Sequence, residues 1–176
     1  MVYLKRMKIL VTGGAGFIGS HILVELLKKK HVVFVIDNFS NSSPNVFKKI
    51  NEISNCDINF ETIDLLNNDG LKQFFSDFVP DLIIHLAGLK SVTESNENPL
   101  IYYENNVIGS INLLKAMDAV ECKNIIFSSS ATVYGDPQYL PIDENHPRKP
   151  NNTYGVTKFM IEEIIKDWCK TDNEKK

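Results

Sequence analysis

Tyr154 and Lys158 are the residues of this sequence whose types and spacing best suit proton transfer. They stand four positions apart, so in a helix both side chains lie on one face, about one turn apart. A tyrosine with an ordinary pKa near ~10 is a poor base at neutral pH, but a neighbouring ammonium group or a positively charged ring favours the phenolate. The pair can therefore act as a general base, although the same spacing also arises by chance.

A run of three serines, residues 128–130, ends an apolar stretch that has the composition of a strand. In open α/β sheets, ligands bind at the carboxyl ends of the strands. A hydroxyl group from this run can therefore face the same cleft as Tyr154 and share the proton of a substrate. Together the serine, the tyrosine and the lysine form a candidate catalytic set.

The segment KILVTGGAGFIG, residues 8–19, predicts a buried strand, a glycine turn and the start of a helix. Gly14, Gly16 and Gly19 match the pattern G-x-G-x-x-G, and Gly13, Gly16 and Gly19 match G-x-x-G-x-x-G. Glycine permits backbone shapes and close approaches that a Cβ atom forbids, and the N–H groups at the start of the helix can hold a pyrophosphate. The alternative is a glycine turn that binds no ligand.

Acidic residues follow the second and third apolar segments. Asp37 lies eighteen positions after Gly19, near the place where an acid meets the ribose hydroxyl groups of adenosine. A carboxylate at this place repels a 2′-phosphate, which favours NAD over NADP; the alternative is an aspartate that caps the next helix. Asp64 is either in reach of the adenine edge or a turn residue.

The segment HLAGLK, residues 85–90, follows the fourth apolar segment. Its small Ala-Gly pair allows the backbone to approach a cofactor closely. Lys90 then places a cation at the mouth of the cleft, unless it is an ordinary solvated lysine. A loop with four prolines, residues 136–151, is expected to be ordered near the same ends of the strands.

Strands and helices alternate along the chain, which predicts an α/β fold with right-handed crossovers and a parallel, Rossmann-like doubly wound sheet covered on both faces. The predicted strands are residues 9–11, 32–36, 58–63, 82–86 and 125–128. The predicted helices are residues 16–30, 44–55, 68–78, 100–120 and 152–170. A sheet of this type usually has six strands, and five precede the polar segment 171–176, so we expect the sheet to be incomplete at its C-terminal end.

Composition narrows the class of protein further. With 176 residues, 43% hydrophobic content and a net charge of −3, the chain suits a single domain with no global attraction to nucleic acid or anionic lipid. No apolar run approaches the ~18 residues of a membrane span, and the start MVYLKRMK lacks the apolar stretch of a signal peptide. Three widely spaced cysteines, Cys56, Cys122 and Cys169, suggest inert thiols in a reducing, cytoplasmic compartment. The four histidines show no metal-ligand spacing and are expected to be structural.

Six motifs together make the chain resemble the extended short-chain dehydrogenase/reductase family, that is, the NAD-dependent epimerases and dehydratases, and within it the epimerases of UDP-sugars. The motifs are TGGAGFIGSH at 12–21, DNFSNS at 37–42, HLAGLKSVTES at 85–95, YYENNVIG at 102–109, FSSSATVYG at 127–135 and YGVTK at 154–158. They stand in the order of the family and span nearly the whole chain. The resemblance implies that residues 1–176 form its NAD-binding domain.

The resemblance also implies roles for individual residues. It implies a pyrophosphate site at Gly13, Gly16, Phe17, Ile18 and Gly19, and an adenosine ribose site at Asp37, Asn38, Phe39, Ser40, Asn41 and Ser42. It implies an adenine site at Asp64 and Leu65, and a nicotinamide side at Leu86, Ala87, Gly88, Leu89, Lys90 and Asn105. Lys158 would bind the nicotinamide ribose. Ser130 and Tyr154 would contact the sugar hydroxyl at carbon four, with Tyr154 as the base and Lys90 also near the substrate.

The activity implied is the interconversion of UDP-galactose and UDP-glucose by hydride transfer to bound NAD⁺, rotation of a 4-keto sugar and return of the hydride. Dehydratases of the family carry an acidic pair directly after the serine, where this chain has Ala131 and Thr132, so dehydration is disfavoured. Epimerases of UDP-glucuronate or UDP-N-acetylhexosamines stay open as alternatives.

The resemblance also sets expectations for what lies beyond the sequence. The family continues past residue 176 with a further strand and a domain that binds UDP, and it forms homodimers. We therefore expect either an epimerase, whole or in part, or a truncated and inactive chain that at most binds NAD.

Overall fold

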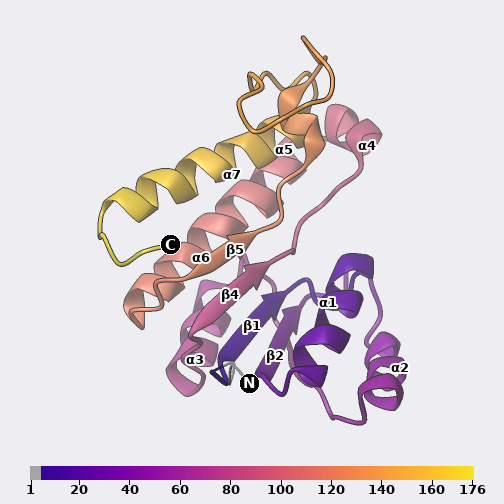
Figure 1. Cartoon of the computed structure of the whole chain (residues 1–176), viewed down its shortest axis with the longest axis vertical. Coiled ribbons are helices and arrows are strands. Elements are labelled where there is room, and N and C mark those ends of the chain that lie inside the picture. Colours follow the sequence, from indigo (N-terminus) through magenta and orange to yellow (C-terminus); the bar gives the residue numbers. More distant parts are fainter. Residues whose placement is uncertain (1–4) are drawn as a thin grey trace.

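The computed structural model describes residues 5–176, so the first four residues of the start examined for a signal peptide lie outside it. Its five strands form one sheet in the order β3-β2-β1-β4-β5, and every neighbouring pair is parallel (Figure 1). The strands are β1 (Lys8–Thr12), β2 (Val32–Asp37), β3 (Asn59–Thr62), β4 (Leu82–His85) and β5 (Ile125–Phe127). The parallel α/β fold and all five predicted strands are confirmed, with ends that differ by at most one residue.

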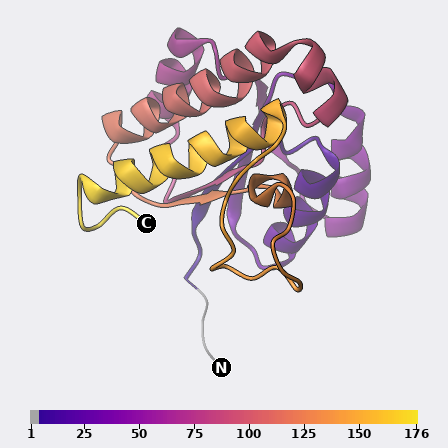
Figure 2. The same ribbon diagram turned by 90° about the horizontal axis from the view of Figure 1, so that it is seen from above.

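Helices cover both faces of this sheet (Figures 1 and 2). The helices are α1 (Phe17–Lys28), α2 (Asn45–Ser54), α3 (Asn68–Asp77), α4 (Val92–Glu97), α5 (Pro99–Tyr102), the π-helix η1 (Tyr103–Ile108), α6 (Gly109–Ala119), the 3₁₀-helix η2 (Ala131–Tyr134) and α7 (Thr153–Lys170). Helices α1 and α2 pack on one face, and α3, α6 and α7 pack on the other. This is the layer arrangement of a doubly wound sheet.

The central strand β1 shows why both faces are apolar. Leu10 belongs to the core formed with α3 and α6, whereas Ile9 and Val11 belong to the core formed with α1 and α2. Successive side chains of a strand point to opposite faces, so a strand covered on both sides must be apolar throughout. Burial of these three side chains fixes β1 at the centre, where it pairs with β2 and β4.

The helix predicted over residues 100–120 is three consecutive helical segments, α5, η1 and α6. A π-turn takes more residues than an α-turn, so it shifts the buried face along the helix. Tyr102 is fully buried, whereas its neighbour Tyr103 is only partly buried. Helix α4 was not predicted, because its sequence VTESNE has no apolar period.

The polar segment after α7 folds back on the sheet instead of extending away from it. The backbone N–H of Lys176 donates to Lys123, and the N–H of Ile125 donates to the carbonyl oxygen of Lys176. Lys175 forms an ion pair with Asp118 at 2.7 Å. These contacts place the end of the described chain beside the outer edge of β5 (Figure 1).

Two further observations concern the whole of residues 5–176. None of the helices there combines the length and the apolar character needed to span a bilayer. All three cysteines are free thiols, of which Cys122 is buried, Cys169 partly buried and Cys56 exposed.

The turn after β1 requires glycine at position 13, and this requirement can be tested. The φ of Gly13 is +68°, and an added Cβ atom would lie 2.6 Å from the backbone nitrogen of Ala87. We expect Gly13→Ala to lower the free energy of unfolding by about 2 kcal/mol or more, because it adds left-handed strain to a backbone clash. Urea unfolding followed by circular dichroism measures this loss.

Gly16→Ala is the matched control, since Gly16 has a φ of −73° and its Cβ atom would meet only the carbonyl oxygen of Gly13, at 3.3 Å. If both substitutions lowered the free energy of unfolding equally, the close approach of Gly13 to Ala87 would not be the cause of the loss.

Candidate functional site

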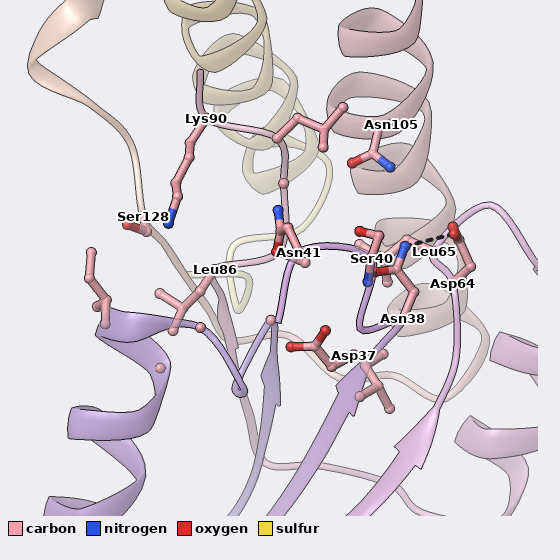
Figure 3. Close-up of a pocket in the computed structure, with 18 of the residues that line it drawn as sticks. Asp37, Asn38, Ser40, Asn41, Asp64, Leu65, Leu86, Lys90, Asn105 and Ser128 are labelled. Atoms are coloured by element: carbon pink, nitrogen blue, oxygen red, sulfur yellow. Dashed lines mark hydrogen bonds between the residues drawn. The ribbon is translucent and has the colours of Figure 1, made fainter. Parts of the chain in front are cut away.

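A cleft lies at the carboxyl ends of the strands, where the strand order reverses between β1 and β4 (Figure 3). Such switch points are the usual binding crevices of open α/β sheets. The cleft is lined by Gly13, Gly16, Phe17, Ile18, Gly19, Ile36, Asp37, Asn38, Ser40, Asn41, Ile63, Asp64, Leu65, Leu86, Ala87, Gly88, Leu89, Lys90, Asn105 and Ser128. Most residues singled out from the sequence are therefore brought together in one place.

Some lining residues were missed, and some of the selected residues lie elsewhere. Ile36 and Ile63 line the cleft although they were read only as strand residues; each directly precedes a selected aspartate, Asp37 at the end of β2 and Asp64 just after β3. Phe39, Ser42, Ser130, Tyr154 and Lys158 are not among the residues that line it.

The glycine turn delivers the start of α1 to the cleft. Gly16 is the N-cap residue, and no side chain caps the helix. The first N–H groups of an α-helix have no partner within the helix, and together with the helix dipole they attract an anion. Phe17 and Ile18 stand at this end with exposed fractions of 75% and 57%. The turn can therefore hold a phosphate group under an apolar rim.

Asp37 ties the glycine turn to the loop after β2. One carboxylate oxygen accepts the N–H of Ala15 at 3.0 Å, and the other accepts the N–H of Phe39 at 2.9 Å and the hydroxyl of Ser42 at 3.1 Å. Its carboxylate faces the cleft (Figure 3). Phe39 packs its ring against Phe47, with 6.2 Å between centroids, and Ser42 is held by its bond to Asp37; neither residue lines the cleft.

Asp64 serves both as a turn residue and as part of the cleft wall. One carboxylate oxygen accepts the N–H of Leu66 at 2.8 Å, which shapes the turn after β3. The other accepts the side-chain amide of Asn38 at 2.8 Å (Figure 3). The structure thus confirms Asp64 as a turn residue, and its reach to an adenine edge stays a prediction.

The loop after β4 is held by Asn106, which sequence reasoning missed. Its side-chain oxygen accepts the N–H of Leu89 at 2.8 Å, and its amide nitrogen donates to the carbonyl oxygen of Leu89 at 3.0 Å and to the hydroxyl of Thr157 at 3.2 Å. Asn105, one position earlier in η1, lines the cleft. Two successive amides of the π-helix η1 thus have different roles: Asn105 lines the cleft, and Asn106 holds the loop after β4.

A buried hydrogen-bonded chain supports the same loop from below. The hydroxyl of Thr12 accepts the N–H groups of Leu86 and Ala87 at 3.2 Å and lies 2.7 Å from Nδ1 of His85. Nε2 of His85 lies 2.9 Å from the hydroxyl of Ser110. Complete burial, followed by the charge of Lys158, lowers the pKa of His85 to about 3, so the ring is neutral. His85 therefore joins β1, β4 and α6 as a structural residue.

Lys158 is almost fully buried, with 5% exposure. Its ammonium group donates to the carbonyl oxygen of Ser128 at 3.0 Å and lies 4.7 Å from the centre of the Phe127 ring. Burial lowers the pKa of Lys158 to about 8. The ring of Tyr154, one turn away on α7, has its centre 5.9 Å from this nitrogen. The predicted pair therefore shares one helix face, and its cation lies close to the phenol ring.

The three serines after β5 point in three directions. Ser128 lines the cleft, and Ser129 donates its hydroxyl to Glu162 of α7. Ser130 caps η2, where its hydroxyl oxygen accepts the N–H and the hydroxyl of Thr132 at 3.2 and 2.9 Å. As the acceptor in both bonds, Ser130 keeps its own proton for another partner.

The proline-rich loop 136–151 is held by side-chain contacts to α7 and within the loop. Arg148 forms ion pairs with Glu162 at 2.8 Å and with Glu163 at 2.7 Å, which fastens the loop to α7. His146 is buried within the loop, and its Nε2 accepts the N–H of Gln138 at 3.0 Å. This histidine also has a structural role.

Known proteins match this chain over most of its length. The sequence model described as "NAD dependent epimerase/dehydratase family" matches residues 9–174. The human UDP-glucose 4-epimerase is 48% identical over 172 residues, and that of Bacillus subtilis (strain 168) is 47% identical over 168 residues. These alignments cover 94% and 96% of the chain but 49% and 50% of the relatives.

Solved structures agree with the sequence matches. The crystal structure of UDP-glucose 4-epimerase from Bifidobacterium longum in complex with NAD⁺ and UDP has a TM-score of 0.92 at 42% identity, over 94% of this chain and 50% of that one. The UDP-Glc/GlcNAc 4-epimerase from Campylobacter jejuni has a TM-score of 0.92 at 38% identity, over 96% and 51%. The chain thus spans about half the length of the relatives that it matches.

The burial of Lys158 predicts a dependence of stability on pH. Below pH 8 the folded protein buries a charged amine, so Lys158→Met is expected to raise the free energy of unfolding at pH 7 by about 2–3 kcal/mol. Between pH 8 and 10.5 the folded wild type has lost this proton while the unfolded chain still binds it, so wild-type stability gains on the variant as pH rises.

Thermal unfolding of both proteins without added ligand, from pH 6.5 to 10, measures this difference. A gap in Tm that stays constant across that range would contradict the buried charge.

Proposed function

The chain belongs to the NAD dependent epimerase/dehydratase family, and from that premise we propose that it supplies the cofactor site and the proton-transferring groups of a UDP-glucose 4-epimerase of galactose metabolism. The observation that carries the proposal is the position of the Tyr154–Lys158 pair. Lys158 bonds to Ser128, a residue of the cleft wall, so the pair stands beside the crevice that begins at the glycine turn. The human and Bacillus subtilis relatives, which are 48% and 47% identical to this chain, are UDP-glucose 4-epimerases.

We propose that the cleft binds NAD. The uncapped start of α1 would hold the pyrophosphate, and the carboxylate of Asp37 would accept the hydroxyl groups of the adenosine ribose. Negative charge at Asp37 disfavours the 2′-phosphate of NADP. Asp64 and Leu65 would border the adenine, and the loop from Leu86 to Lys90 would border the nicotinamide.

In this reaction the residues of the chain move and hold one proton. Tyr154, as phenolate, would take the proton of the sugar hydroxyl at carbon four. It would later return the proton to the same oxygen, once the configuration at carbon four is the opposite one. Lys158 would hold its positive charge near the phenol ring, with its nitrogen 5.9 Å from the ring centre, and Ser130 would offer its free proton to the sugar oxygen. When bound, NAD⁺ supplies the hydride acceptor and donor chemistry. The sugar then changes configuration without net oxidation.

The positions after Ser130 favour epimerisation over dehydration. Ala131 and Thr132 stand there, and Thr132 uses both its N–H and its hydroxyl on Ser130. Elimination of water needs an additional acid and base, and these two residues supply neither. UDP-N-acetylhexosamines are an alternative class of substrate, favoured by the similarity to the Campylobacter jejuni enzyme, and UDP-glucuronate is another.

A second candidate function is NAD binding without epimerase activity. It would apply if residues 5–176 do not by themselves orient the sugar nucleotide against the phenol, as catalysis requires.

We also propose a homodimer in the cytoplasm. Three large apolar side chains along α5 and η1 are exposed, Leu100 at 79%, Ile101 at 53% and Ile108 at 49%. Large apolar side chains gathered on a surface mark interaction sites, and in this proposal a second copy covers these three. The three free thiols support a reducing compartment.

Cofactor preference is directly measurable. Titration of the chain with NAD⁺ and NADP⁺ in a calorimeter is expected to give an affinity for NAD⁺ that is higher by ~10-fold or more, because Asp37 repels the extra phosphate. Gly16→Ala should stay folded and bind NAD⁺ more weakly, since its methyl group would stand in the cleft wall. Equal affinities for the two nucleotides would remove Asp37 from its proposed role.

Turnover distinguishes the two candidate functions. Incubation of the chain with UDP-galactose and NAD⁺, followed by chromatography, is expected to yield UDP-glucose. Tyr154→Phe should lower kcat by ~100-fold or more with unchanged affinity for NAD⁺, because it removes the base. No product from the wild-type chain would favour the binding function, and a normal rate in the variant would exclude Tyr154 as the base.

A further inference from the structure

Helix α4, which has no counterpart among the sequence predictions, packs against the start of α7 (Figure 1). Ser95 lies in α4 and is completely buried. Its hydroxyl oxygen accepts the backbone N–H of Tyr154 at 3.1 Å, and its proton goes to the carbonyl oxygen of Val92 at 2.6 Å. A buried serine thus connects α4 directly to the backbone of the proposed base.

The first turn of α7 obtains its hydrogen bonds largely from α4. Ser95 binds the N–H of Tyr154, and the side chain of Asn96 accepts the N–H of Thr153 at 3.2 Å. Of the first three N–H groups of α7, that of Gly155 alone is bonded from within its own segment, by the side chain of the N-cap residue Asn152 at 2.8 Å. The first N–H groups of a helix otherwise lack partners, so their acceptors determine where the turn sits. Two of the three acceptors lie nearly sixty residues earlier in the chain.

Helix α4 is itself held by a buried tyrosine. The hydroxyl of Tyr102 accepts the N–H of Ser91 at 3.0 Å and donates to the carboxylate of Glu94 at 2.8 Å. Burial and the bond to Glu94 raise the pKa of Tyr102, so the hydroxyl keeps the proton that it donates. Ser91 also caps α4 by accepting the N–H of Glu94. The short helix is therefore fixed at its start.

The same segment begins in the cleft. Leu86 to Lys90 line the crevice, and Ser91 follows at once as the cap of α4. One short, hydrogen-bonded connection thus joins the wall of the cleft to the turn that carries Tyr154. We propose that Ser95 is a positioning residue: through this connection it sets the distance between the phenol of Tyr154 and the cleft. This inference rests on the proposed function of Tyr154 as the base.

A positioning role differs in its consequences from ordinary helix capping. Removing one cap costs typically ~1 kcal/mol of stability wherever it acts on the helix. A displaced catalytic group costs rate instead, up to ~100-fold for a shift of 1 Å. Asn152→Ala removes a cap from the same turn but leaves the link to α4 intact, so it is the matched control for Ser95→Ala.

The test uses the whole chain with NAD⁺ and UDP-galactose, with a double-mutant cycle on Tyr154. Ser95→Ala is expected to lower kcat by ~10-fold with little change in KM or in NAD⁺ affinity, and to cost less than ~2-fold in the Tyr154→Phe background. Asn152→Ala should lower Tm to a similar extent and kcat by less than ~2-fold. Equal losses of rate in both backgrounds, or the same loss from Asn152→Ala, would overturn the proposal.

A second measurement does not depend on turnover. In the NAD⁺-bound chain with ¹³C-labelled tyrosine, Ser95→Ala is expected to shift or broaden the ring signal of Tyr154, assigned with Tyr154→Phe, and to leave that of the exposed Tyr139 unchanged. An unchanged Tyr154 signal would overturn the positioning role even in an active enzyme. Absence of epimerase activity in the wild type, with a shifted Tyr154 signal, would refute the proposed function alone and retain the link between Ser95 and Tyr154.

Discussion

The close approach of two backbone turns, after β1 and after β4, is the constraint on which the rest of this structure depends. Gly13 lies so near Ala87 that a Cβ atom has no room there. Thr12 and His85 hold the two turns together through a buried hydrogen bond of 2.7 Å. Because these turns follow adjacent parallel strands at the reversal of strand order, their contact forms the floor of the cleft.

Opposite charges lie on the two sides of this cleft floor. Asp37 places a carboxylate on one side of the cleft, and Lys158 lies next to Ser128 on the other. Burial makes the lysine costly as a free cation, which explains why its pKa falls to about 8. An anionic partner, such as a phenolate or a ligand, would recover part of that cost. The costly burial of the Lys158 charge thus indicates a functional role, since stability alone would favour an apolar side chain here.

The loop from Leu86 to Lys90 lines the cleft, and buried residues that do not line it hold this loop and its neighbours in place. Asn106 binds both backbone groups of Leu89, and Ser95 binds the backbone of Tyr154. Both are buried, and both connect the segment after β4 to its neighbours η1 and α7. Buried polar side chains of this kind must be fully hydrogen-bonded to be tolerated, so they specify one arrangement of the elements they join.

The sequence by itself determined the order of strands and helices, the glycine turn, Asp37 and the Tyr154–Lys158 pair, because each has a local period or a fixed spacing. It did not reveal α4, η2 or the π-turn, since their residues lack such a period. Nor did it separate Phe39, which packs behind the loop, from its neighbours in the cleft wall. Only the tertiary structure decided these points, because a hydrogen bond between Ser95 and Tyr154 joins residues fifty-nine positions apart and leaves no trace in local pattern.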